Sequence, residues 1–265
     1  MPEPTTWNRT LAGKTAIVTG AGTEGEGIGI GRATAVVLAG EGARVCLVDR
    51  EAQRAQATRA QIEALGGAAF ITVGDVTVRE DCARFVEETV QRYGRLDILV
   101  ANAGIWNEQD TPIEKLTERE WDEMIRVNLK SVYAVIHYAV PHMIAQKGGR
   151  IVAISSTAGQ RGEAFHSHYG ASKGAIISFV KGLASELAAH NILVNCVAPG
   201  WVDPDMSASV LGKKAGMKSA LAPIALKRVA TAEEIAGPIL FAASDLATFI
   251  TGEVINVNGG SVLCG

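Results

Sequence analysis

Short apolar runs rich in β-branched residues alternate with stretches of helical periodicity along most of the chain. The apolar runs are nearly continuous rather than alternating, which is typical of parallel strands buried on both faces. The expected strands are Thr15–Gly20, Arg44–Asp49, Ala69–Asp75, Ile98–Ala103, Arg150–Ser156, Leu193–Pro199 and Glu253–Val257. Among the expected helices are Ala52–Leu65, Glu80–Tyr93, Glu118–Gln146 and Ser167–His190. The alternation predicts an α/β fold, a single doubly wound parallel sheet of about seven strands with helices on both faces.

The chain shows no linker, internal repeat or low-complexity tract, so one domain over residues 1–265 is predicted. The exception to the alternation is residues 201–228, which have helical composition interrupted by Pro204, Gly212, Gly216 and Pro223. An insert after the carboxyl end of a strand overhangs the ligand crevice of a doubly wound sheet. We therefore expect a substrate lid there; a rigid packing pair of helices is the alternative.

Bulk composition excludes several classes of protein. The 265 residues are 48% hydrophobic and 20% charged with a net charge of −3 and no basic block, which disfavours nucleic acid as a partner. No apolar run reaches the roughly 18 residues of a membrane span, and residues 1–9 do not resemble a secretory signal. The four cysteines lack metal-ligand spacing, and Cys46 and Cys196 fall in apolar runs. We expect buried free thiols, no metal site and a cytoplasmic protein.

A glycine-rich turn follows the first expected strand. Thr19-Gly20 ends that strand, and Gly29-Ile30-Gly31 opens the next helix. Glycines at this place let the backbone approach a pyrophosphate, which then binds the free N–H groups of the helix N-terminus. The order of strand, turn and helix therefore predicts a dinucleotide site.

The acidic residue Asp49 closes the second strand, twenty residues after Gly29. A carboxylate there accepts hydrogen bonds from both ribose hydroxyls of NAD and repels the 2′-phosphate of NADP. Arg50 would tolerate that phosphate, whereas Glu24 and Glu26 in the glycine turn oppose it. The pattern favours NAD, with NADP as the alternative, and a helix cap is the other interpretation of Asp49.

Two further strand ends carry candidate cofactor contacts. Asp75-Val76 follows the third strand and could bracket the adenine, unless Asp75 only forms a turn. Asn102-Ala103-Gly104 ends the fourth strand, where small residues permit close approach of the adenosine. Asn102 either contributes to binding or ties neighbouring strands together.

The segment Tyr169-Gly170-Ala171-Ser172-Lys173 carries the chemistry. On a helix Tyr169 and Lys173 share one face, with β-carbons about 5–6 Å apart. An ammonium there favours the phenolate, so we expect the pKa of Tyr169 below its usual value of about 10. Such a tyrosine exchanges a proton with a secondary alcohol or ketone. Ser156, thirteen residues before Tyr169, ends the fifth strand, where its hydroxyl could donate to a developing alkoxide or cap a helix.

With these pieces in their order, the chain resembles the short-chain dehydrogenase/reductase family from about Gly13 to Gly260. The matching residues are Thr19-Gly20, Gly29-Ile30-Gly31, Asp49, Asp75-Val76, Asn102-Ala103-Gly104, Asn128, Ser156, Tyr169 to Lys173, and Pro199-Gly200. The resemblance implies an NAD(P)-binding Rossmann fold with strand order 3-2-1-4-5-6-7, hydride transfer and a homotetramer.

The same resemblance implies a role for each catalytic candidate. Tyr169 would donate or accept the proton, and Ser156 would hydrogen-bond the substrate oxygen. Lys173 would lower the pKa of Tyr169 and hold the nicotinamide ribose. Asn128 would anchor a water in a proton relay; a solvated or kink-forming residue within a helix is the alternative.

Two features depart from the family pattern. Eight residues separate Gly20 from Gly29 where the family usually has three, and the extra Thr23–Gly27 is acidic; we expect it either to bulge into solvent or to fold over the pyrophosphate. Pro204 stands where the family commonly has a threonine that contacts the nicotinamide carboxamide. Backbone groups of Val202 can still serve the carboxamide.

Substrate-facing candidates follow the fourth, fifth and sixth strands: Trp106, Gln160, Arg161, Phe165, His166, His168 and Trp201. Arg161 could clamp an anionic group or be a solvated loop charge, and the two histidines could merely shape the loop before Tyr169. The sequence thus predicts an NAD-dependent oxidoreductase that transfers hydride between the nicotinamide and a secondary alcohol or ketone. The alternatives are an NADP-linked 3-oxoacyl carrier protein reductase and a non-catalytic dinucleotide sensor or scaffold.

Overall fold

Seven parallel strands form one sheet in the order β3-β2-β1-β4-β5-β6-β7, which confirms the predicted order. The computed structural model describes residues 10–23, 27–203 and 214–263. The strands are β1 (Thr15–Thr19), β2 (Arg44–Asp49), β3 (Ala68–Val73), β4 (Ile98–Ala101), β5 (Gly149–Ile154), β6 (Ile192–Pro199) and β7 (Val254–Val257). Their ends lie within two residues of the predicted ends, since the glycine or polar residue after a strand often leaves the ladder.

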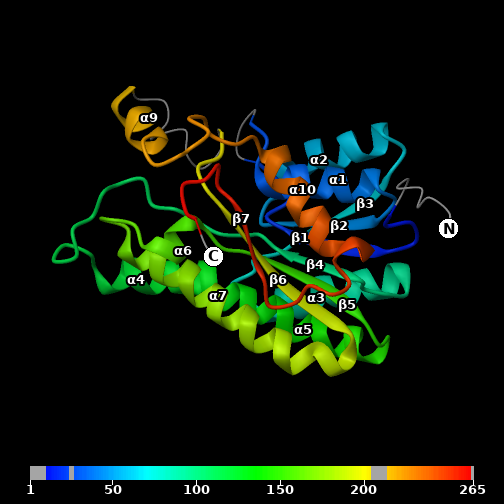
Figure 1. Ribbon diagram of the computed structural model, residues 1–265. Coiled ribbons are helices and arrows are strands. Elements are labelled where there is room, and N and C mark those ends of the chain that lie inside the picture. Colours follow the sequence, from blue (N-terminus) through cyan, green and yellow to red (C-terminus); the bar gives the residue numbers. More distant parts are fainter. Residues whose placement is uncertain (1–9, 24–26, 204–213, 264–265) are drawn as a thin grey trace.

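Helices cover both faces of the sheet (Figure 1). One face carries α1 (Ile30–Gly40), α2 (Ala52–Ala64) and α10 (Ala232–Ala243), and the other carries α3 (Arg79–Tyr93), α5 (Ser131–Ala145) and α7 (Ser167–Leu187). The shorter elements are α4 (Glu118–Ile125), η1 (Arg126–Lys130), α6 (Thr157–Arg161), η2 (Ala188–His190), α9 (Lys214–Leu221) and η3 (Asp245–Ala247). None of the helices described is long and apolar enough to span a membrane.

Successive strand residues supply two separate hydrophobic cores. In β5, Ile151 and Ala153 pack with α5 and α7, whereas Val152 and Ile154 pack with α1 and α10. Each fully buried Val, Leu or Ile side chain stabilises the fold by about 1.5–3 kcal/mol relative to exposure. Burial on both faces explains why the strands read as continuous apolar runs.

The predicted helix Glu118–Gln146 is confirmed as an unbroken helical run over residues 118–145, and one π turn interrupts its regular α-helical pattern. The structure divides it into α4, the π-helical turn η1 and α5. A π turn inserts an extra residue and re-aims the side chains within it. Asn128 lies in this turn, fully buried, with its amide bonded to the loop after β4. These tertiary hydrogen bonds favour a turn that helical periodicity does not signal.

Helix α10 was not among the expected helices, although its start carries a local signal. The Thr231 side chain accepts a hydrogen bond from the backbone N–H of Glu234, and the Glu234 side chain accepts one from the N–H of Thr231. This capping box, Thr-x-x-Glu before an apolar run, marks a helix start. Once formed, α10 packs closely on α1.

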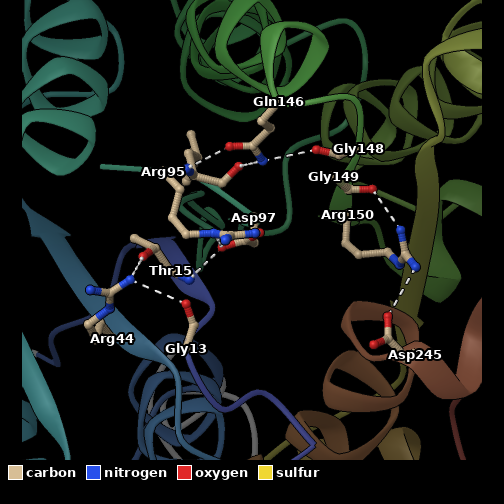
Figure 2. A network of polar contacts seen from close by, with 11 residues as sticks. Gly13, Thr15, Arg44, Arg95, Asp97, Gln146, Gly148, Gly149, Arg150 and Asp245 are labelled. Carbon is tan, nitrogen blue, oxygen red and sulfur yellow. Dashed lines mark hydrogen bonds and ion pairs between the residues drawn. The ribbon is translucent and has the colours of Figure 1, made fainter. Parts of the chain in front are cut away.

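A polar network lies at the amino ends of the strands (Figure 2). Asp97, 7% exposed, accepts hydrogen bonds from the backbone N–H of Thr15 at 2.8 Å and from Nε and Nη2 of the Arg95 guanidinium. Gln146 donates to the carbonyl of Leu96 and accepts from its N–H. The network joins β1, the segment before β4 and the end of α5, far from the carboxyl ends of the strands.

The expected lid over residues 201–228 is described only in part, because Pro204 and Gly212 lie outside the described residues. Helix α9 stands beyond the carboxyl ends of the strands (Figure 1). After it, Ile224 is 2% exposed, and Val202 forms a bridge to Ala230. These contacts anchor both flanks of the segment, and its action as a lid stays a prediction.

Candidate active site

A cleft of about 490 Å³ opens along the carboxyl ends of the strands. Every predicted cofactor residue lines it, as do Ser156, Trp106 and Trp201. The other site candidates, Asn128, Gln160, Arg161 and His166, lie outside its lining. Sequence reasoning missed several lining residues that carry no motif of their own: Gly22, Arg54, Thr77, Arg126, Ser155 and Glu163.

The glycine cradle brings helix α1 into direct contact with the end of β1. A β-carbon on Gly31 would lie 1.9 Å from the carbonyl oxygen of Gly20 and 2.6 Å from Nδ2 of Asn102. Gly20 itself has φ of +64°, a conformation that glycine adopts without strain. Only glycine therefore permits this approach of the helix start to the strand end.

The start of α1 has the properties of an anion site. Gly29 caps the helix without a side-chain hydrogen bond, and the first turn contains no acidic residue. Its free N–H groups and the helix dipole therefore favour a negative group at this end. The pyrophosphate of a dinucleotide fits the cradle. Of the extra residues in this turn, 24–26 with both glutamates lie outside the described part of the chain.

Asp49 lies at the rim of the cleft with its carboxylate bonded to backbone. Its Oδ2 accepts from the N–H of Gly22 at 3.0 Å, and its Oδ1 accepts from the N–H of Glu51 at 3.3 Å. The contact to Glu51, the residue directly before α2, agrees with the capping interpretation. The carboxylate retains acceptor capacity toward a ribose, and Arg50 beside it is exposed.

The next two candidate positions organise the backbone around the cleft. Asp75 Oδ1 accepts from the backbone N–H and the hydroxyl of Thr77, which is the turn-forming interpretation. Asn102 Nδ2 donates to the carbonyls of Thr19 and Gly20 and so ties β4 to β1. The Asp75 side chain therefore shapes the turn after β3, and the Asn102 side chain holds the ends of β4 and β1 together at the cleft.

Ser156, Tyr169 and Lys173 converge at the other end of the cleft. Ser156 caps α6, its Oγ accepting from the N–H of Ala158 at 3.2 Å, and its hydroxyl lies close enough to the phenol of Tyr169 to oppose a rise in the pKa of that phenol. Lys173 is 5% exposed; its Nζ donates to the carbonyl of Ile154 at 2.9 Å and lies 5.8 Å from the centroid of the Tyr169 ring. The Ser156 hydroxyl therefore caps α6 and also lies beside the Tyr169 phenol, so the two interpretations of Ser156 are compatible.

The expected lowering of the Tyr169 pKa was wrong for the protein alone. Burial raises the pKa of Tyr169 to about 12, although the nearby Ser156 hydroxyl opposes the rise. Burial also lowers the pKa of Lys173 to about 8. Removal of both groups from water penalises their charged forms, and this outweighs the attraction that the four-residue spacing suggested.

Asn128 acts on the loop that follows β4. Its Oδ1 accepts from the N–H of Ile105 at 2.7 Å, and its Nδ2 donates to the carbonyl of Ile105 at 3.0 Å. A β-carbon on Gly104 would lie 3.1 Å from Oδ1 of Asn128 and 3.5 Å from Nζ of Lys173. Asn128 is therefore a buried clamp beside the lysine, rather than a solvated residue.

Aromatic rings form the wall beside Tyr169. The Trp106 ring packs edge-on against Tyr169, with centroids 4.6 Å apart, and lies 6.1 Å from Trp201 in a similar arrangement. On its other side Trp106 stacks on His166 at 4.0 Å. The reacting end of the cleft thus has an apolar, ring-lined side.

The remaining substrate candidates have protein partners. Gln160 donates to Oδ1 of Asn256 at 2.6 Å, and Arg161 pairs with Glu163 at 2.8 Å. Phe165 is 53% exposed with φ of +63°. His168 is buried, and burial together with nearby His166 lowers its pKa. Within the described residues no group of three or more His, Cys, Asp or Glu could hold a metal ion.

Similar proteins cover nearly the whole chain. Residues 25–261 match the family model described as enoyl-(acyl carrier protein) reductase. A 3-oxoacyl-[acyl-carrier-protein] reductase FabG of Thermotoga maritima is 41% identical over 253 residues, 96% of this chain and 99% of that one. The FabG of Staphylococcus aureus strain Mu50 is 37% identical over 93% of this chain and 97% of its own.

Solved structures agree with the fold. A short-chain type dehydrogenase/reductase from Mycobacterium ulcerans superimposes with a TM-score of 0.89 at 31% identity, covering 95% of this chain and 90% of that one. Levodione reductase gives 0.87 at 31% identity, covering 94% and 98%. Sheet, cradle and relatives together define a nicotinamide-dependent oxidoreductase. Within that class, the chain belongs to the short-chain dehydrogenase/reductase family.

Proposed function

We propose that this oxidoreductase interconverts a secondary alcohol and a ketone with NAD(H), using Tyr169 as the acid or base. The convergence of Ser156, Tyr169 and Lys173 at one end of a dinucleotide-sized cleft carries the proposal. When bound, the nicotinamide accepts or supplies the hydride.

Each residue of this group has a role that its surroundings support. With a pKa of about 12 in the free protein, Tyr169 holds its proton at neutral pH and is ready to protonate a forming alkoxide during reduction. Ser156, which lines the same end of the cleft as Tyr169, donates to the same substrate oxygen. Asn128 holds the Ile105 backbone beside Lys173 and would keep a proton-carrying water in place.

Alcohol oxidation makes an additional demand on Lys173. Tyr169 must lose its proton, and a charged Lys173 stabilises the phenolate that results. In the free protein, burial lowers the pKa of Lys173 to about 8, so the side chain loses its charge as the pH rises through this value. Ribose hydroxyls at its Nζ would add acceptors that favour the ammonium.

Preference for NAD over NADP is supported by the position of Asp49. Its carboxylate lies at the end of β2, held by the Gly22 N–H, where the 2′ position of the adenosine ribose would approach. A 2′-phosphate would meet this negative charge. The exposed Arg50, and Arg54 beside Gly22, are cations of the same lining that favour a phosphate instead.

A titration of NADH and NADPH against the purified protein, followed by nicotinamide fluorescence, tests this preference. NADH should bind more tightly, and Asp49→Ala should reduce the ratio of the two dissociation constants. Glu63→Gln is the matched control, because Glu63 is an exposed carboxylate on α2 that pairs with Arg59, and neither residue lines the cleft. An unchanged ratio in Asp49→Ala would remove Asp49 from the role.

A second candidate is an NADP-linked 3-oxoacyl carrier protein reductase. Two relatives named FabG, at 41% and 37% identity, favour it. Reduction of acetoacetyl-CoA with NADPH faster than any alcohol is oxidised with NAD would place this candidate first. Absence of turnover together with retained NADH binding would instead support a dinucleotide sensor.

Assembly as a homotetramer and a cytoplasmic location belong to the same proposal. Helices α4 and α5 expose Trp121 and Tyr133, at 39% and 41%, on a surface that a second copy could cover. Light scattering at micromolar concentration should give four times the chain mass of 27.8 kDa. A monomer at that concentration would contradict the assembly.

A further inference from the structure

The ring of His166 lies between two carbonyl oxygens. Its Nδ1 is 3.1 Å from the oxygen of Ala164, and its Nε2 is 3.1 Å from the oxygen of Asn107. A carbonyl oxygen only accepts hydrogen bonds, and a neutral imidazole donates from one nitrogen alone. In this orientation of the ring, both contacts are hydrogen bonds only when the ring carries two protons.

The charged groups around the ring also bear on its protonation. Asp110 Oδ1 lies 3.9 Å from Nδ1 and supplies a counter-charge, though its side chain is 76% exposed. Two features oppose the second proton: His166 directly precedes the N-terminus of α7, and the residue is only 5% exposed. Of the other titratable groups nearby, Glu163 is paired with Arg161, and Glu120 on α4 lies near His168 rather than His166. His168 and Tyr169 follow His166 on α7.

Through this ring the loop after β4 is fastened to the loop before α7. Asn107 and its neighbour Trp106 belong to the first loop, and Ala164 belongs to the second. A parallel link is the backbone hydrogen bond from Thr111 to the carbonyl of Phe165, whose φ of +63° is unfavourable for a bulky side chain and needs such support. Trp106 stacks on His166 at 4.0 Å with planes 13° apart, then meets Tyr169 edge-on at 4.6 Å.

We propose that His166 is a positioning residue which, as the imidazolium, clasps these two loops and holds Trp106 against Tyr169 as the substrate-side wall. An imidazolium over an indole face adds a cation–π attraction that a neutral ring lacks. Loss of the second proton opens one of the two hydrogen bonds, and Trp106 loses its support. His166 touches neither the cleft nor Ser156, so its effect passes through Trp106. Only the expected effect on substrate binding rests on the proposed function.

The protonation state is tested directly by ¹H–¹⁵N spectra of the full chain labelled in its histidine rings. The chain has five histidines, and His166→Gln identifies the signal of interest by its loss. At pH 7 we expect both ring nitrogens of His166 to show imidazolium shifts. A bare nitrogen in that ring at pH 7 overturns the proposal.

The coupling to Trp106 is tested by indole fluorescence during a pH titration, since a protonated imidazole quenches a stacked indole. The wild type and His168→Gln should show a transition that is absent from both His166→Gln and Trp106→Phe. Asp110→Asn, at an exposed position, should move the transition to lower pH because the counter-charge is gone. A transition that persists in His166→Gln contradicts the clasp.

Kinetics then test the effect on the wall. With the best ketone substrate, His166→Gln should raise KM about tenfold, the scale of one lost charge-assisted hydrogen bond, with kcat nearly unchanged. NADH affinity of the variant should stay at the wild-type value, and this result serves as the control that the variant is folded. A wild-type KM contradicts the positioning role. The spectra need no turnover, so failure of the proposed activity is distinguishable from failure of the clasp.

Discussion

Replacement of Gly31 by alanine tests whether close contact between α1 and β1 builds the cofactor site. The new β-carbon would lie 1.9 Å from the Gly20 carbonyl oxygen, whereas ordinary contact starts at 3.4 Å. The helix start must therefore retreat by about 1.5 Å, because both partners are backbone. Overpacking of this kind costs about 1–3 kcal/mol, and we expect the upper end.

The better helix propensity of alanine returns up to about 1 kcal/mol, so the net destabilisation of Gly31→Ala is about 2 kcal/mol. For a chain of this size that lowers Tm by roughly 4–8 °C. NADH affinity should fall at least about tenfold, or roughly 1.4 kcal/mol, since the N–H groups at the start of α1 are displaced.

Gly40→Ala is the matched control, because Gly40 ends the same helix and its added β-carbon would meet nothing within 4 Å. It should leave NADH affinity unchanged and raise Tm slightly. Scanning fluorimetry and an NADH titration measure both quantities. A Gly31→Ala protein with the wild-type Tm and NADH affinity would refute the close-contact argument.

Two further predictions concern stability. Asp97→Ala leaves the Thr15 N–H buried and unpaired, so it should cost about 2 kcal/mol while NADH affinity stays unchanged; Asp245→Ala, which breaks an exposed ion pair, should cost under about 1 kcal/mol. Because burial lowers the pKa of Lys173 from 10.5 to about 8, the folded state binds fewer protons between these values, and stability from this group rises with pH. It is fully present above pH 10.5 and is lost as pH falls through 8, a change of up to about 3 kcal/mol. Unfolding curves of the wild type and Lys173→Met across this range should diverge accordingly, and parallel curves would contradict the buried-amine argument.

The sheet could be predicted from sequence because burial on both faces requires a continuous apolar run in each strand. Val152 and Ile154 face one core while Ile151 and Ala153 face the other, so no polar alternation interrupts the run. The glycine cradle could also be predicted from sequence, since its glycines lie in one turn of the chain.

Features that depend on tertiary contacts could not be predicted from sequence in this way. The π turn at Asn128 arises from hydrogen bonds to Ile105, a distant partner in sequence. The pKa of Tyr169 was predicted from its neighbour Lys173, but burial dominates it, and burial is a property of the whole fold. The stack of Trp106 on His166 likewise joins two loops whose approach no spacing reveals.

The central claim is that Tyr169 transfers the proton, and Tyr169→Phe tests it most directly. The substitution removes one hydroxyl from the partly buried ring and leaves the edge-on contact with Trp106 in place. Turnover should be measured beside NADH affinity, with Tyr133→Phe on exposed α5 as the control. The account predicts a loss of at least about 100-fold in kcat with unchanged NADH affinity. Activity within about tenfold of the wild type would contradict it.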